Sequence, residues 1–164
     1  MNDNPGSGDL LRGAAFHEAG HVVVAKHLGL PIGKIEIGID GSGKADIGPA
    51  DHLPLIDQLA VCVAGIEAQE LFNCHTHPHA ALADYGKVIG LLDELTEAEG
   101  REYRDAACLR ALEILRKHKP EVERLANHLI EHRRLSVAQE TRGNGARQKL
   151  SDFCGTFASV IWAR

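Results

Sequence analysis

The chain has 164 residues, of which 44% are hydrophobic and 25% are charged, and its net charge is −5 at pH 7. This length and composition predict a single globular domain with a buried core. The negative charge argues against a nucleic-acid backbone or an anionic membrane as partner. No apolar run approaches the roughly 18 residues that a membrane-spanning helix needs, and the polar start of the chain does not resemble a signal peptide. We therefore expect a cytoplasmic protein with no transmembrane segment.

Cysteine and histidine usage bears on metal binding. The four cysteines are widely separated and form no CxxC pair, so we expect reduced thiols that mostly pack as small apolar residues. Ten histidines are many for this length and direct attention to metal sites. Three of them alternate in the stretch CHTHPH. We interpret this stretch as a polar loop at the mouth of a cleft rather than a second metal site, because it lacks a helical frame.

The first half of the chain predicts two helices and a strand between them. Residues 1–8 have the composition of a flexible N-terminus, and Asp9 can cap a helix that runs to about Leu28, where a glycine and a proline end it. Alternation in Lys34–Ile39 predicts a half-buried strand whose three isoleucines share one face. A DGSGK loop follows this strand. The stretch Pro54–Phe72 is apolar on nearly every side, so we expect a helix buried in the core.

The second half predicts further helices. The third covers about Ala81–Leu95, and the capping-box spacing of Thr96 and Glu99 predicts the start of a fourth. Pro120 should end the fourth helix and lie in the first turn of a fifth. The apolar face of this fifth helix consists of Val122, Leu125 and Leu129. These elements predict a mainly α-helical domain over residues 9–140, with a small β element after the first helix.

A C-terminal extension, residues 141–164, begins with an RGNG break. Apolar residues recur there at helical spacing, which predicts a terminal helix. The apolar stripe consists of Leu150, Phe153, Phe157 and Ile161. Such a helix can dock on the body of the domain or on a partner, and packing within the chain is the commoner arrangement.

The main functional motif is HEAGH at residues 17–21. Residues four apart on a helix share a face, so His17 and His21 can present ring nitrogens to one metal ion. Glu18 lies about 100° round the helix from His17, too far to be a natural third ligand but well placed to reach a water on the ion. This division into two ligands and one general base is typical of HExxH peptidases. A chance match on a surface helix is the alternative, and the apolar VVVA run that continues the helix favours the catalytic interpretation.

The third ligand must come from elsewhere in the chain. Two imidazoles and one carboxylate suit Zn²⁺, and three protein ligands leave a position open for water. Spacing alone does not choose among the candidates, which are Glu67, Glu70, His75, His77, His79 and Asp84. Glu67, Gln69 or Glu70 can instead orient a ligand histidine from behind. The strand predicted at Lys34–Ile39 is a candidate for pairing with an extended substrate backbone.

Three stretches carry a resemblance to a known family: RGAAFHEAGHVVVA, AGIEAQEL and AALAD. Together they resemble the peptidase domain of FtsH-type ATP-dependent zinc proteases, over roughly Leu11–Gln139. In that family a basic residue precedes HEAGH, as Arg12 does here. A later helix carries the pattern matched by Ala64, Gly65, Ala68 and Glu70. The family's third zinc ligand is an aspartate after this helix, and Asp84 takes that place. The resemblance therefore implies a zinc peptidase with His17, His21 and Asp84 as ligands and Glu18 as base.

The chain also differs from this family. It contains no GxxxxGK[ST] phosphate-binding loop, so the resemblance is to a free-standing peptidase domain without the AAA ATPase module. Such a domain is expected to cleave unfolded or flexible polypeptides without ATP, or to use a separate unfoldase. FtsH-type peptidase domains form hexameric rings, so the resemblance also implies a homo-oligomer.

Two other functions stay open from the sequence. In the first, the chain is a non-catalytic scaffold or adaptor, with a structural metal or none at the same motif. The retained Glu18 argues against this reading, because a structural site needs no base. In the second, the chain is a regulatory protease that cuts one protein. No DNA-binding segment is evident in the sequence, so we rank this function lower.

Overall fold

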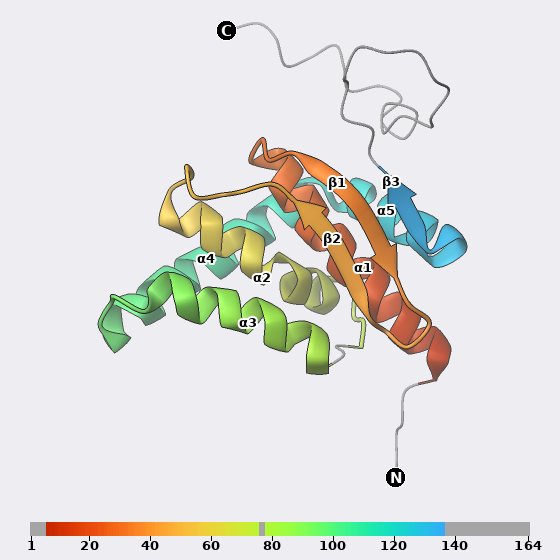
Figure 1. Cartoon of the computed structure of the whole chain (residues 1–164), viewed down its shortest axis with the longest axis horizontal. Helices are drawn as coiled ribbons and strands as arrows, with labels where there is room; N and C mark the ends of the chain where they lie inside the picture. Colours follow the sequence, from red (N-terminus) through yellow and green to blue (C-terminus); the bar gives the residue numbers. More distant parts are fainter. Residues whose placement is uncertain (1–5, 76–77, 137–164) are drawn as a thin grey trace, which may run out of the picture.

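A computed structural model describes residues 6–75 and 78–136 of the chain. It is mainly α-helical with a small sheet, as predicted (Figure 1). In chain order the elements are α1 (Ser7–His27), β1 (Ile32–Ile37), β2 (Gly43–Ile47), α2 (Leu55–Leu71), α3 (Pro78–Leu92), α4 (Glu97–Lys117), α5 (Lys119–His132) and β3 (Arg134–Ser136). The helix predicted within residues 141–164 lies outside the described residues. Within the described residues, no helix is long and apolar enough to cross a membrane.

Helix α1 is the centre of the fold. It contacts the sheet through β1 and β2, and it also contacts α2 and α5, while α4 and α3 pack against α2 (Figure 1). Every residue from Gly13 to Ala25 is buried, which explains the small and apolar residues that surround HEAGH. Gly20 makes the contact with α2 close. A Cβ atom at this position would lie 2.5 Å from the Ala64 carbonyl oxygen and 2.5 Å from Ala68 Cβ. The motif therefore lies on a helix that its neighbours hold on several sides.

The start of α1 differs from the prediction. The helix begins at Ser7, with Gly6 at the N-cap position and no side-chain cap. Asp9 lies inside the first turn, where its negative charge favours the positive end of the helix dipole. The prediction that Asp9 caps the helix was therefore wrong, and Ser7 and Gly8 belong to the helix rather than to a flexible N-terminus.

The sheet has three antiparallel strands in the order β2-β1-β3. Ile35 is fully buried in β1 and faces Ala45 of β2 and Leu135 of β3. The predicted strand extended to Ile39, but β1 ends at Ile37, and Ile39 is 72% exposed in the turn that follows. The DGSGK stretch is not entirely a loop, because its last two residues begin β2. Since β1 is the middle strand and pairs on both sides, it cannot be the candidate strand for pairing with a substrate and instead closes the core. Strand β2 is an edge strand of the sheet, and several of its residues line a cleft between the sheet and helices α2 and α3.

Helices α4 and α5 follow the local signals closely. Helix α3 instead begins and ends three residues before the predicted Ala81–Leu95, and so includes the last two residues of the stretch expected to be a loop. Thr96 caps α4 in a capping box, in which its side chain accepts a hydrogen bond from the Glu99 backbone N–H and the Glu99 carboxylate accepts one from the Thr96 N–H. Pro120 lies in the first turn of α5, and the predicted apolar face of α5 is buried. Arg133 ends α5 in the left-handed conformation with φ 64°. This turn leads the chain directly into β3, a strand that the sequence analysis did not predict.

Candidate metal centre

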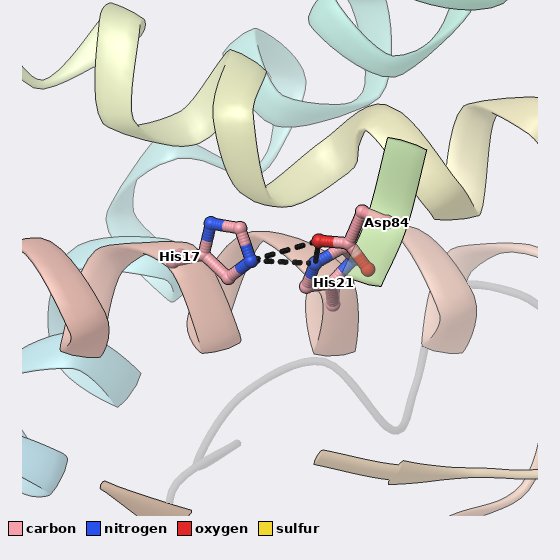
Figure 2. A group of neighbouring side chains, drawn as sticks. All are labelled: His17, His21 and Asp84. Carbon is pink, nitrogen blue, oxygen red and sulfur yellow. Dashed lines mark hydrogen bonds and ion pairs between the residues drawn. The ribbon is translucent and has the colours of Figure 1, made fainter. Parts of the chain in front are cut away.

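Three predicted ligands meet in the structure. His17 and His21 lie one turn apart on α1, and Asp84 reaches them from α3 (Figure 2). The Asp84 Oδ2 atom is 2.9 Å from His17 Nε2 and 2.9 Å from His21 Nε2, and the two Nε2 atoms are 3.0 Å apart. All three residues are at most 6% exposed. Among the side chains that the structure describes, they form the one group of three or more His, Cys, Asp or Glu residues that could hold a metal ion.

The far sides of both imidazole rings are held by hydrogen-bond acceptors. The Nδ1 atom of His21 lies 2.7 Å from the Val61 carbonyl oxygen, and Nδ1 of His17 lies 3.3 Å from Gln69 Oε1. These oxygens accept hydrogen bonds, so each neutral ring carries its proton on Nδ1. Each Nε2 atom then directs a lone pair at Asp84 Oδ2, which is itself an acceptor. Three converging acceptor atoms fit a bound metal ion.

Gln69 is the residue that orients His17. Its Nε2 atom donates to the Gly13 carbonyl oxygen at 3.0 Å and to the His75 carbonyl oxygen at 3.2 Å, which turns Oε1 toward His17. The side chain is buried, with 1% exposure. Gln69 thus fills the orienting role for which the sequence analysis also considered Glu67 and Glu70. Glu70 is exposed on the outer face of α2.

The remaining third-ligand candidates lie away from the cluster or outside the described residues. The carboxylate of Glu67 contacts the Cys108 thiol of α4. His75 is exposed and interacts with the centre only through its backbone carbonyl. His77 lies outside the described residues, as does the side chain of His79. Among the described candidates, only Asp84 joins the two histidines.

Asp84 and His21 shift each other's pKa. Burial alone would raise the pKa of Asp84, but the hydrogen bonds that His17 and His21 donate when Nε2 carries a proton, and the one from Lys87, hold it well below its usual range. Burial likewise works against the charged form of His21. The hydrogen bond and negative charge of Asp84 outweigh that burial and raise the His21 pKa. Asp84 is therefore an ionised carboxylate, the form that binds a metal ion.

Gly65 of α2 provides the space that the imidazole rings need. A Cβ atom here would lie 2.5 Å from His17 Cε1 and 2.5 Å from His21 Nε2. We expect Gly65→Ala to displace both rings and to lower zinc affinity by about 10–100-fold, the usual cost of disturbing a group that orients a ligand. Gly86→Ala in α3 is the matched control, because a Cβ atom there meets nothing within 4 Å. Calorimetry on both variants checks this, and unchanged zinc affinity in Gly65→Ala would contradict the geometry.

Glu18 lies beside the three ligands but does not belong to them. Its side chain is buried, and burial raises the pKa of its carboxyl group, with the neighbouring histidines acting in the opposite direction. Gly43 at the start of β2 passes close to it: a Cβ atom at Gly43 would lie 2.4 Å from Glu18 Oε1. The start of β2 therefore lies close to the Glu18 carboxylate.

A cleft of about 880 Å³ opens over the centre. Its walls come from β2 on one side and from α2 and α3 on the other, and Glu18 and the three ligands contribute to its lining. Apolar side chains, among them Val61, Cys62 and Leu91, continue the lining beyond the ligands. The centre is therefore both held by buried residues and accessible from solvent.

Zinc binding should weaken as the pH falls, because protons compete for the imidazole nitrogens. The pKa of His21 is raised above its ordinary value of 6.5, so this competition should begin at a higher pH than for a free imidazole. Below that pKa we expect zinc affinity to fall about tenfold per pH unit for each proton displaced. Chelator competition from about pH 8 to about pH 5 measures it. A pH-independent affinity would show that His21 is not a ligand.

The basic residue before the motif has a structural role. Arg12 donates to the Phe72 carbonyl oxygen at 3.2 Å and lies 2.8 Å from Cys74 Sγ, so it binds the end of α2. This contact joins the start of α1 to the segment that leads toward α3. It therefore helps to position the two elements that carry the ligands.

Comparison with known proteins adds no family. The sequence matches no known family profile and no curated protein. The resemblance to FtsH-type peptidases thus rests on the three sequence stretches alone and stays a prediction.

Proposed function

We propose that the chain is a zinc metalloendopeptidase that hydrolyses peptide bonds in unfolded or flexible polypeptides. The observation that carries this proposal is the convergence of His17 Nε2, His21 Nε2 and Asp84 Oδ2 at the floor of a cleft, with Glu18 beside them. A structural metal site is typically closed by four protein ligands, whereas a catalytic site keeps a position open. Three ligands, a buried carboxylate and solvent access support the catalytic interpretation.

Zinc, when bound, would polarise the peptide carbonyl and lower the pKa of a water molecule. The carboxylate of Glu18 would accept a proton from the attacking water and deliver it to the nitrogen of the leaving amine. The reaction adds one water molecule across the C–N bond and leaves a carboxylate and an amine. Burial of Glu18 raises its pKa, which makes the carboxylate a stronger base than an exposed one.

The edge of β2 is the proposed place for the substrate backbone. One edge of β2 pairs with β1, and several of its residues line the cleft, namely Gly43, Lys44, Ala45 and Ile47. An extended peptide added along this edge would form main-chain hydrogen bonds and pass directly over Glu18. Main-chain recognition requires an extended substrate, which supports unfolded or flexible polypeptides as the substrate class. A separate unfoldase and a homo-oligomeric ring remain predictions from the resemblance.

The test is cleavage of casein, an unfolded protein, by the purified zinc-loaded chain, beside a tightly folded protein of similar size. We expect peptides from casein and none from the folded protein, as read by mass spectrometry. No cleavage of casein by fully zinc-loaded protein would contradict the proposal and favour the scaffold function. A mixed peptide library separates the remaining alternative, because a regulatory protease would leave nearly all of the library uncut.

A further inference from the structure

The two oxygens of the Asp84 carboxylate have different partners. Oδ2 faces the two histidines, while Oδ1 accepts a hydrogen bond from Lys87 Nζ at 3.0 Å. Lys87 lies three residues further along α3, almost one helical turn, and lines the cleft. The sequence analysis did not single out this lysine. Its ammonium group lies at the rim of the centre, in contact with a proposed ligand.

This ion pair differs from an ordinary pair on a helix surface. Exposed pairs contribute little, because water screens both charges. The Lys87 side chain is 64% exposed, but the Asp84 side chain is 6% exposed, so the carboxylate has few other partners for Oδ1. A comparison pair in the same protein is Arg101 with Glu97 on α4, whose side chains are 61% and 91% exposed. Of these two pairs, only the pair of Lys87 and Asp84 includes a buried carboxylate, whose orientation the lysine can restrict.

The number of oxygens that Asp84 offers matters for the reaction. A carboxylate can bind a metal ion through one oxygen or through both. Binding through both oxygens would add a ligand and occupy space that a reacting water and a peptide carbonyl need. A partner that holds Oδ1 away from the ion keeps the carboxylate to one bond. Such orienting partners commonly determine the activity of metal sites.

We propose that Lys87 is a positioning residue that holds Oδ1 of Asp84, so that Asp84 binds the metal through Oδ2 alone and a coordination position stays open. This inference rests on the proposed metal centre and adds a determinant of its geometry. Lys87 acts through Asp84 and does not itself transfer a proton.

Lys87→Met, Lys87→Arg and the control Arg101→Met test this role. Each is loaded with Co²⁺ in place of zinc, because the intensity of the visible cobalt bands reports the number of ligands. We expect Lys87→Met to show weaker bands, typical of an added ligand, and a kcat for casein about 10–100-fold lower with little change in KM. Lys87→Arg keeps a donor and should restore both the bands and kcat. Arg101→Met should match the unaltered chain.

Two results would overturn the inference. The first is a Lys87→Met spectrum identical to that of the unaltered chain, whether or not kcat falls, because Lys87 would then not control the ligand number. The second is a failure of Lys87→Arg to restore the spectrum. Failure of the proposed function looks different: the unaltered chain would then bind no cobalt, or would bind it and leave casein intact.

Discussion

Replacing Glu18 by glutamine is expected to abolish cleavage of casein while zinc stays bound. The amide has nearly the same shape as the carboxylate, so the contact with Gly43 is kept, but it cannot accept the proton from water. Removing a general base costs about 10²–10⁴-fold in rate, so we expect no cleavage above background. The measurement combines a casein assay with metal analysis of the same sample.

The matched control for Glu18→Gln is Glu70→Gln. Glu70 is exposed on the outer face of α2, so its substitution should leave both zinc content and cleavage unchanged. Full activity of Glu18→Gln would mean that another group takes the proton. Loss of zinc from this variant would show that Glu18 is a ligand rather than a base.

Replacing Asp84 by alanine should lower zinc affinity by more than about 100-fold, since loss of a group that merely orients a ligand already costs about 10–100-fold. Asp84 is the carboxylate of the candidate metal centre and the one proposed ligand on α3. The change also leaves Lys87 without its carboxylate partner. Calorimetry with zinc, and the rise in melting temperature on adding zinc, both measure the loss.

Asp93→Ala is the matched control, because Asp93 is an exposed aspartate just beyond the end of α3. It should bind zinc like the unaltered chain. If Asp84→Ala kept full zinc affinity, the third ligand would be wrong, and His79 would be the next residue to replace.

Local sequence signals predicted most of the helical frame. The period of α1 was enough to place His17 and His21 on one face, because two residues four apart on a helix meet whatever surrounds them. The capping box at Thr96 and Glu99 is likewise a local contact, and the structure contains it. Such features depend on the nearest turn of the chain and not on the rest of the fold.

Features that depend on distant elements were predicted less well. Ile39 matched the alternation of a strand, but the chain turns after Ile37, so Ile39 has no core to face. Strand β3 exists because α5 ends beside β1, which no pattern in a three-residue segment can indicate. The strand order β2-β1-β3 likewise depends on contacts between distant segments, which no local pattern in the sequence indicates.

The candidate site shows the same division. Helical periodicity placed the two candidate ligands His17 and His21 on one face and Glu18 beside them, but it left six candidates for the third ligand. Asp84 was favoured only by the resemblance until α3 brought it to the histidines. Gln69 rather than Glu70 orients His17. Successive residues of α2 point in different directions, so that Gln69 is buried next to His17 and Glu70 is exposed to solvent. Lys87 carried no sequence signal beyond its spacing of three from Asp84.

The most direct test of a zinc-dependent peptidase at His17, His21 and Asp84 is a zinc titration of the metal-free chain with casein present. We expect the cleavage rate to rise in proportion to added zinc and to level off at one ion per chain. A rate that does not depend on zinc, or no cleavage once one zinc ion is bound, would contradict this expectation.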